Sequence, residues 1–126
     1  MTQIFMAIAS ILAGLAVAAG AFGAHALKDK LTERAIEIFD TAARYQMYHA
    51  LALLLVALLL TRVETPPPFL NAAGFAFIVG IAIFSGSLYA LSLSGIKWLG
   101  AIAPIGGAAF MIGWACLAVA AFNLKY

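Results

Sequence analysis

The chain has 126 residues, of which 66% are hydrophobic and only 10% charged, and its formal net charge is +2. Soluble domains average about 45–50% apolar and about 25% charged residues, so this composition is typical of a membrane protein. The seven basic residues form no dense run, which argues against a nucleic-acid partner. The single cysteine, Cys116, excludes an intrachain disulfide and a cysteine-rich metal site.

The first apolar segment covers residues 4–24 and is long enough to cross a bilayer, which takes about 20 residues. Its end contains Ala24-His25-Ala26, a pattern like that of a signal-peptidase site. A cleaved leader also needs a basic start and a shorter apolar core, and this segment has neither. We therefore predict a retained membrane helix, with a cleaved leader as the alternative.

The connection 25–43 carries most of the charge of the chain. Thr32 suits the N-cap of a helix, and segment 32–43 has an apolar face at helical spacing. This amphipathic segment either lies on the membrane surface or extends the next membrane helix. No glycine or proline interrupts the chain before the three prolines of the next loop, which favours the extension. Asp40 and Arg44 stand four residues apart, acid first, and are predicted to pair.

Three further crossings follow. The apolar run 51–60 is too short to span a bilayer alone, so the second helix must recruit the polar residues before it. Pro66 to Pro68 end it, Gly95 ends the third helix, and Pro104 predicts a kink in the fourth. The predicted crossings after the first are 44–61, 69–93 and 98–122. The sequence thus predicts an all-α fold with a single membrane domain, 1–126, built as a four-helix bundle.

Lysine and arginine are distributed unequally between the two ends of this bundle. One end holds Arg62 and Lys125, and the other holds Lys28, Lys30, Arg34, Arg44 and Lys97. An excess of basic residues marks the cytoplasmic side of a membrane protein. We predict a multi-pass protein of the inner cell membrane, with its termini outside and the charged loop 25–43 in the cytoplasm.

Each of the four helices has polar residues, or the proline and glycines of the fourth helix, near the end of the bundle that contains the charged loop 25–43. The candidates for a polar cluster or ligand site are His25, Asp40, Arg44, Tyr45, His49, Ser85, Tyr89, Pro104, Gly106 and Gly107. Ionisable groups at membrane depth seek protein or water, so we predict a closed, hydrogen-bonded cluster. In it, the Tyr45 and His49 face meets Ser85 and Tyr89, and His25 lies at the rim.

Proline and glycine in the fourth helix complete this prediction. Pro104 removes a backbone donor, so the carbonyl of Gly100 needs a histidine or tyrosine to bond it, and Gly106 and Gly107 leave room for a ring or a water. The cluster serves either to specify the packing of the bundle or to bind a small ligand. We favour the first.

Four stretches of this sequence resemble a known family. They are Gly20 to Leu27, Phe39 to Leu51, Phe84 to Tyr89, and Ala103 to Gly107 with Gly113-Trp114. The chain resembles the family called "domain of unknown function 423", small multi-pass proteins of bacterial inner membranes whose animal relatives are called transmembrane protein 256. The resemblance implies a multi-pass membrane protein, and it supplies no activity, cofactor or catalytic residue.

No motif of a known catalytic centre occurs, since HExxH, GxSxG, CxxC and a phosphate-binding glycine loop are all missing from the sequence. We expect no enzyme, no catalytic residue, no metal and no cofactor. The preferred interpretation is a structural, accessory or interaction subunit, whose partners are the lipid bilayer and either further copies or a larger membrane complex. The alternative is an oligomeric transporter or channel component. A haem protein using His25 and His49, and an intramembrane enzyme, rank below both.

Overall fold

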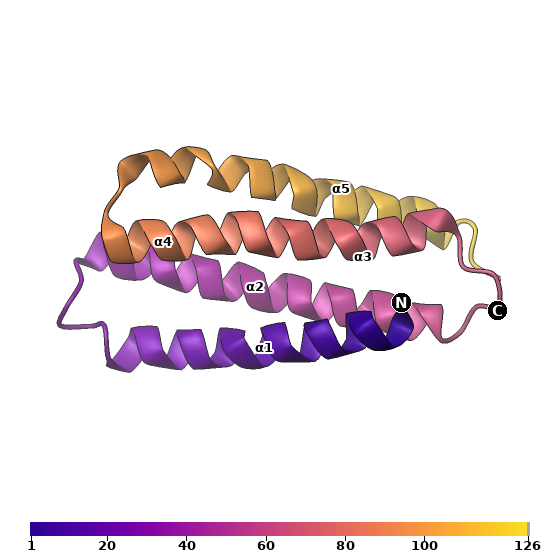
Figure 1. Cartoon of the computed structure of the whole chain (residues 1–126), viewed down its shortest axis with the longest axis horizontal. Helices are drawn as coiled ribbons and strands as arrows, with labels where there is room; N and C mark the ends of the chain where they lie inside the picture. The colour runs from indigo at the N-terminus through magenta and orange to yellow at the C-terminus, as the bar shows by residue number, and fades with distance from the viewer. Residues whose placement is uncertain (126) are drawn as a thin grey trace.

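A computed structural model of the chain describes residues 1–125, which form helices joined by short loops (Figure 1). The elements are α1 (Thr2–His25), α2 (Glu33–Leu60), α3 (Pro68–Gly80), the π-helical turn η1 (Ile81–Ser85), α4 (Gly86–Ser94), the 3-10 helix η2 (Lys97–Ala101) and α5 (Ala103–Ala121). Four stretches are long and apolar enough to cross a membrane, namely α1, α2, Pro68–Ser94 and Lys97–Ala121. The predicted fold class is confirmed.

The second half of the charged connection 25–43 is part of one long second helix. α2 has 28 residues, and its N-cap is Thr32, whose Oγ1 accepts the Ala35 N–H over 3.1 Å. Glu33 lies in the first turn, where the helix dipole favours an acid. Segment 32–43 therefore extends the membrane helix rather than forming a separate surface helix, and α2 begins well before the predicted crossing 44–61.

The third crossing contains a feature that its sequence does not signal. The helix widens into one π-helical turn, Ile81–Ser85, between α3 and α4. Such a turn changes which side chains face a neighbouring helix beyond it. Gly95 ends the crossing with φ of 72°, a left-handed conformation that favours glycine.

The fourth crossing differs from the kinked helix that we predicted. The chain runs as a 3-10 helix over Lys97–Ala101 and becomes α-helical at Ala103. Pro104 lies in the first turn of α5, where its missing N–H would have no intrahelical partner in any case. The proline thus marks a helix start instead of a kink.

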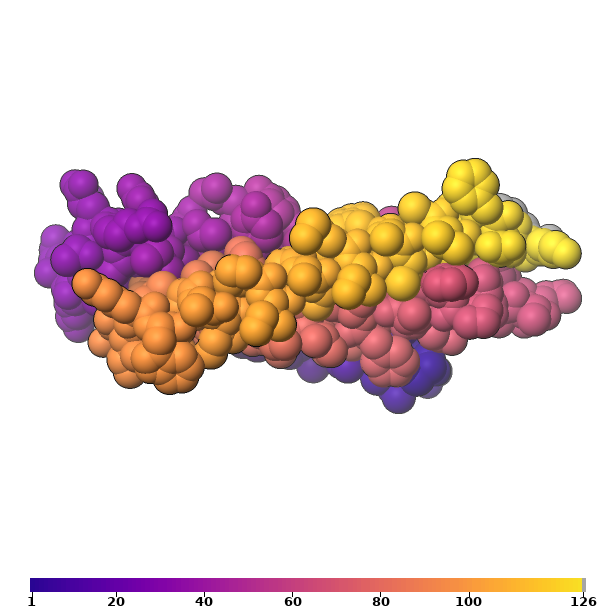
Figure 2. Space-filling view, turned by 90° about the horizontal axis from the view of Figure 1, so that it is seen from above, coloured from indigo at the N-terminus to yellow at the C-terminus, as the bar shows by residue number. Residues whose placement is uncertain are grey.

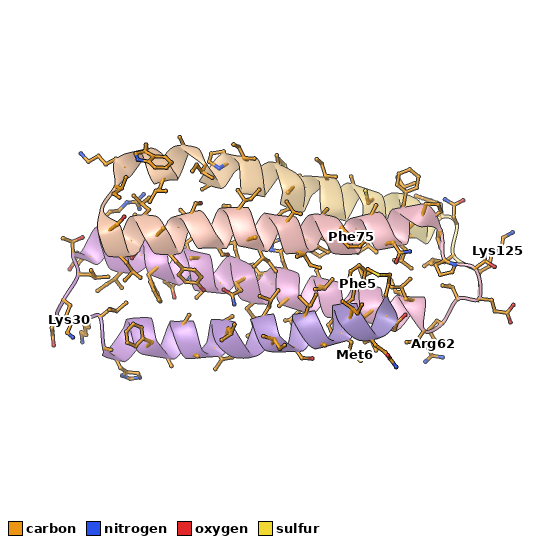
Figure 3. All side chains as sticks on the ribbon, in the orientation of Figure 1. Phe5, Met6, Lys30, Arg62, Phe75 and Lys125 are labelled. Atoms are coloured by element: carbon orange, nitrogen blue, oxygen red, sulfur yellow. The ribbon has the colours of Figure 1, made fainter. Side chains whose placement is uncertain are left out.

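Successive membrane-spanning helices run antiparallel in the bundle (Figure 1). α2 contacts α1 on one side and α3 and α4 on the other, and α5 packs against α3 and η1 (Figure 1). Arg62 and Lys125 lie at one end of the bundle and Lys30 at the opposite end (Figure 3). We call the part near Lys30 the loop half and the part near Arg62 the terminal half.

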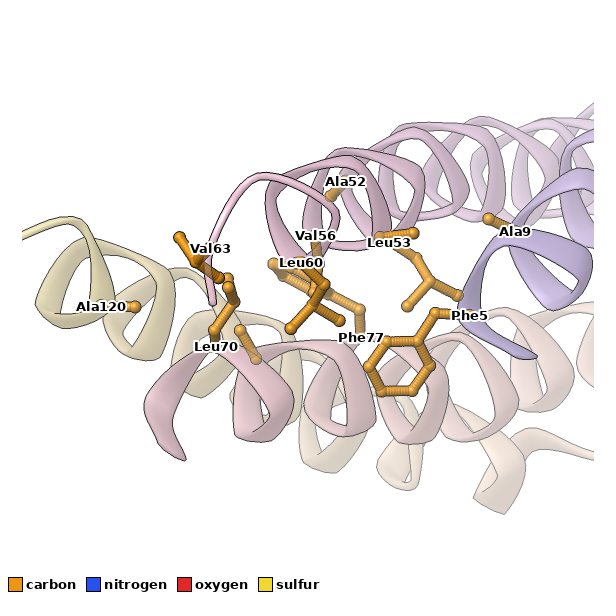
Figure 4. Close-up of a cluster of buried hydrophobic side chains, with 12 residues drawn as sticks. Phe5, Ala9, Ala52, Leu53, Val56, Leu60, Val63, Leu70, Phe77 and Ala120 are labelled. Carbon is orange, nitrogen blue, oxygen red and sulfur yellow. The ribbon is translucent and has the colours of Figure 1, made fainter. Parts of the chain in front are cut away.

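The terminal half contains the main apolar core. Its buried residues come from α1, α2, α3, α5 and, with Val63, from the loop after α2. The most fully buried large side chains include Phe5, Leu53, Val56, Leu70 and Phe77 (Figure 4). Lipid tails are as apolar as these side chains, so close packing rather than escape from water holds such helices together. The ring of Phe5 fills the space beside Gly74, where a Cβ would overlap it.

The contact between α3 and α5 is reciprocal. Phe110 of α5 packs on Gly80 of α3, and Phe77 of α3 packs on Gly113 of α5. At the π-helical turn, Gly106 of α5 approaches the backbone of Phe84 itself, so a Cβ at that position would overlap main-chain atoms. These three glycines let the two helices come close enough for dispersion contacts along the whole interface.

Candidate functional site

The polar groups of the loop half are centred on Gln46, a buried residue of α2. Its Nε2 donates to the carbonyl of Leu12 in α1 over 2.8 Å, and its Oε1 accepts the hydroxyl of Tyr89 in α4 over 2.7 Å. One amide thus joins three helices. Our site candidates left Gln46 out, although an uncharged amide inside a membrane helix is itself a signal of an interhelical bond.

Two serines add bonds between α2 and the third crossing. Ser85 Oγ donates to the carbonyl of Ala42 over 2.7 Å, and Ser92 Oγ donates to the carbonyl of Ala35 over 2.6 Å. Serines in membrane helices often bond back to their own helix, as Ser87 does here with the carbonyl of Phe84. Ser85 and Ser92 instead connect neighbouring helices.

His49 lies on another side of α2, against α5. Its ring stacks on Phe110 with the centroids 3.5 Å apart and the planes at 7°. Nδ1 is 2.8 Å from the carbonyl of Tyr45, and the indole N–H of Trp114 donates to Nε2 over 3.1 Å. A carbonyl only accepts and an indole N–H only donates, so these partners fix a neutral imidazole with its proton on Nδ1. Trp114 was also absent from our site candidates.

The predicted single cluster is therefore two separate clusters. Tyr89 and Ser85 meet α2 at Gln46 and Ala42, next to α1, whereas His49 meets Phe110 and Trp114 of α5. Tyr45 and His49 do stack, with ring centroids 6.1 Å apart, but Tyr45 packs on Phe84 rather than on Tyr89. The prediction that the Tyr45 and His49 face meets Tyr89 is wrong, because Tyr89 bonds Gln46, whereas the ring of His49 lies against Phe110 and Trp114 of α5.

The predicted role of the fourth helix is also wrong. His49 and Tyr89 bond Tyr45 and Gln46, so neither serves the carbonyl of Gly100. Gly106 leaves no space for a ring or a water, because the backbone of Phe84 occupies it, and Gly107 and Pro104 form no part of either cluster. The physical reason is that Pro104 lies in the first turn of α5, so no backbone ladder is opened there.

Three charged or titratable candidates lie away from both clusters. His25 is exposed at the end of α1. Asp40 and Arg44 form the predicted ion pair, and both side chains are about half exposed, 54% and 55% respectively. This pair faces outward from α2 and contacts none of the interior polar groups.

A groove opens between α1 and the third crossing in the loop half. Its volume is about 590 Å³, and Gln46, Ser85 and Tyr89 lie along it between apolar walls that include Leu15 and Leu93. Small-molecule sites commonly have this size, an apolar lining and a few polar groups. Within residues 1–125, no group of His, Cys, Asp or Glu is placed to hold a metal ion.

The chain is similar to known proteins over almost its whole length. Residues 19–107 match the model of a family described as "Protein of unknown function (DUF423)". The chain is 45% identical over 124 residues to a UPF0382 membrane protein of Staphylococcus epidermidis, and 44% identical over 124 residues to the UPF0382 membrane protein YwdK of Bacillus subtilis, with 98% of each chain covered in both cases. A UPF0382 membrane protein of Staphylococcus aureus is 43% identical over 121 residues, which cover 96% of this chain and 97% of the relative. No solved structure matches the chain.

Proposed function

Since the chain belongs to the family of unknown function DUF423, whose relatives are named membrane proteins, we propose that it is a non-catalytic structural or accessory subunit of the membrane. It acts by packing against other membrane components. We place it in the cell membrane with its termini outside and the loop 25–43 in the cytoplasm, on the five-to-two excess of basic residues at the loop end.

The observation that supports this proposal is that the interior polar groups bond neighbouring helices. Gln46, Ser85, Tyr89, Ser92 and Trp114 each bond a group on a neighbouring helix. Placing a polar group in lipid without a hydrogen-bond partner is costly, so these bonds serve the association of the helices. Such side chains are already occupied and leave few free groups for chemistry on a substrate.

The terminal half supports the same conclusion. The buried core cluster of that half, as far as the described residues show it, consists of apolar side chains from Phe5 to Ala120. A path for an ion or a polar solute needs donors and acceptors along its length. Among the described residues, Asn71 has a buried side-chain oxygen in the terminal half, but Ser85 and Ser92, which bond a neighbouring helix, lie in the loop half. This distribution favours a subunit that associates over one that conducts.

The alternative, a component of an oligomeric transporter or channel, has one observation in its favour. The groove between α1 and α4 brings Gln46, Ser85 and Tyr89 to one surface. Several chains arranged with their grooves together would form a partly polar passage through the loop half. The core of the terminal half would still close it.

Two measurements on the same preparation test the proposal. The tagged chain is isolated from its native membranes in mild detergent and its partners are identified by mass spectrometry, and the purified chain is placed in liposomes for flux of monovalent ions and small solutes. We expect a membrane partner in constant proportion and no flux above empty liposomes. Flux carried by the purified chain overturns the proposal and supports the alternative.

A further inference from the structure

The groove of the loop half separates α1 from the third crossing, and α2 contributes Phe39 and Gln46 to its lining. In the terminal half α1 meets the third crossing, because the ring of Phe5 lies against Gly74 and Phe75. Towards the loop end the two helices leave the space of about 590 Å³ between them. The polar side chains along this space are hydrogen-bonded within the chain, and its other walls are apolar. The groove therefore suits an apolar occupant.

Gly86 lines this groove, and packing within the chain does not explain it. Its φ is −59°, an ordinary right-handed helix, and a Cβ added there would meet no atom within 4 Å. Glycine inside a helix is destabilising relative to alanine. By contrast, Gly80 and Gly106 each make room for a neighbouring helix. Gly86 keeps the groove open instead.

The length of the groove matches one leaflet of a bilayer. Its walls extend from Leu12 to Phe22 in α1 and from Ile81 to Leu93 in the third crossing, which at 1.5 Å per residue is about 15–18 Å. The hydrocarbon core of a bilayer is about 30 Å thick, so one leaflet is about 15 Å deep. One end of the groove lies within a turn of the ends of both helices. The groove thus reaches from the headgroups at the loop end to the middle of the membrane.

The width of the groove distinguishes between occupants. Over this length its volume of about 590 Å³ corresponds to a mean cross-section of about 35 Å². An α-helix with its side chains is about 10–12 Å across and has a cross-section of about 80–110 Å². Two extended hydrocarbon chains, with about 4 Å between neighbouring carbons, need roughly 30–40 Å². The groove is too narrow to enclose a helix of another protein and fits the two chains of one phospholipid.

The loop after α1 supplies positive charge at the headgroup end. Lys28 and Lys30 are exposed, and neither forms an ion pair among the described residues. The only acid in loop residues 26–32 is Asp29, so the loop keeps a positive balance. In Figure 2, side chains of the purple segment, which includes this loop, project at the end of the molecule opposite the yellow C-terminal part. Long lysine side chains reach headgroup phosphates, and basic residues near the surface attract anionic lipids.

We propose that the groove binds one anionic phospholipid from the leaflet on the loop side. Its two acyl chains lie between α1 and the third crossing, beside Ala82 and Gly86, and its phosphate lies at Lys28 and Lys30. The lipid thereby joins α1 to the third crossing where the protein itself leaves them apart. This assignment goes beyond the proposed function and does not depend on it, because it concerns a lipid that stays bound.

Native mass spectrometry of the purified full chain tests the site. The probe is phosphatidylglycerol, added with an equal amount of phosphatidylcholine before the detergent is exchanged. We expect the wild type to retain one lipid and to prefer phosphatidylglycerol about five-fold. Gly86→Leu fills the groove and should lower lipid retention at least about five-fold. Gly14→Leu is the matched control and should retain lipid as the wild type does, because a Cβ there also meets no atom within 4 Å and Gly14 does not line the groove.

A second pair of variants tests the headgroup end. Lys28→Gln combined with Lys30→Gln should abolish the preference for phosphatidylglycerol while a lipid is still retained. Arg62→Gln combined with Lys125→Gln removes the same charge at the opposite end of the bundle and should leave the preference unchanged. An equal loss of preference in both double variants contradicts the placement of the phosphate.

The site is overturned if the wild type retains no lipid, or if Gly86→Leu retains as much as the wild type. Circular dichroism shows whether each variant keeps its helices. Should Gly86→Leu fail to fold, Ala82→Leu takes its place, since Ala82 is also exposed and lies on the same wall. The failure of this assignment is separate from that of the proposed function, because the latter fails on solute flux by the purified chain, whether or not a lipid is retained.

Discussion

The indole N–H of Trp114 donates to Nε2 of His49 over 3.1 Å, and this bond ties α5 to α2. The opposite ring nitrogen faces the carbonyl of Tyr45, and Phe110 covers the ring face. The imidazole is thereby held neutral and in one orientation. A histidine in a membrane helix, often read as a sign of proton or metal chemistry, here has both nitrogens engaged in packing the bundle.

Replacing the donor tests this bond. Trp114→Phe leaves Nε2 of His49 without its partner, and interhelical hydrogen bonds in membranes contribute about 0.6 kcal/mol on average and up to about 1.7 kcal/mol. We expect the free energy of unfolding, followed by circular dichroism in mixed micelles, to fall by about 0.5–1.5 kcal/mol. Trp98→Phe is the control, because Trp98 is 65% exposed. Equal losses in both variants would show that the indole bond is not what stabilises the fold.

Close helix packing is tested at two glycines. Gly106→Ala places a methyl group against the backbone of Phe84, which cannot turn aside as a side chain does. We expect a destabilisation of about 1–3 kcal/mol, the usual cost of overpacking. Gly14→Ala is the control, since no atom lies within 4 Å of its added Cβ. Thermal unfolding in detergent should separate the two, and a Gly106→Ala variant as stable as the wild type would contradict the close approach of α5 to η1.

The serine bonds predict a difference between two similar substitutions. Ser92→Ala removes a bond to the carbonyl of Ala35 in α2, whereas Ser10→Ala removes only a bond to Met6 in its own helix. The first should lower the free energy of unfolding by about 0.5–1 kcal/mol and the second by less. A larger loss for Ser10→Ala would argue that these hydroxyl groups act within helices rather than between them.

Orientation is tested with reporters fused in turn after Tyr126. The excess of lysine and arginine at the loop end predicts activity from a reporter that works outside the cytoplasm and none from one that requires the cytoplasm. Activity of the cytoplasmic reporter alone would reverse the orientation. Labelling of a cysteine introduced at Lys30 from the cytoplasmic side provides an independent check.

The sequence predicted the helical fold well because its signals were strong and local. Long apolar stretches, the prolines after α2 and Gly95 each act on the backbone where they occur, and Thr32 caps α2 as its residue type predicts. The i,i+4 pair of Asp40 and Arg44 is equally local and is formed. The position of each polar candidate along its predicted helix also indicated that these residues share the loop half.

The arrangement of the polar residues was less predictable, because it depends on which side of α2 each helix packs. A sequence gives the depth of His49 and Tyr89 but not the order of the helices around α2, so the two residues were assigned to one cluster although they lie in two. The π-helical turn before Gly86 changes the facing of α4 and has no clear sequence signal. Gln46 and Trp114 were missed because the sequence does not show which polar groups face a neighbouring helix.

The central claim is that the polar groups of the loop half hold the helices together. A double-mutant cycle between Gln46 and Tyr89 measures this most directly, using Gln46→Leu, Tyr89→Phe and the double variant, with the free energy of unfolding in mixed micelles as the readout. We predict that each single change is destabilising and that the double variant loses less than the sum by about 0.5–1.5 kcal/mol, because both changes remove the same bond. Single variants as stable as the wild type, with additive effects, would contradict the claim.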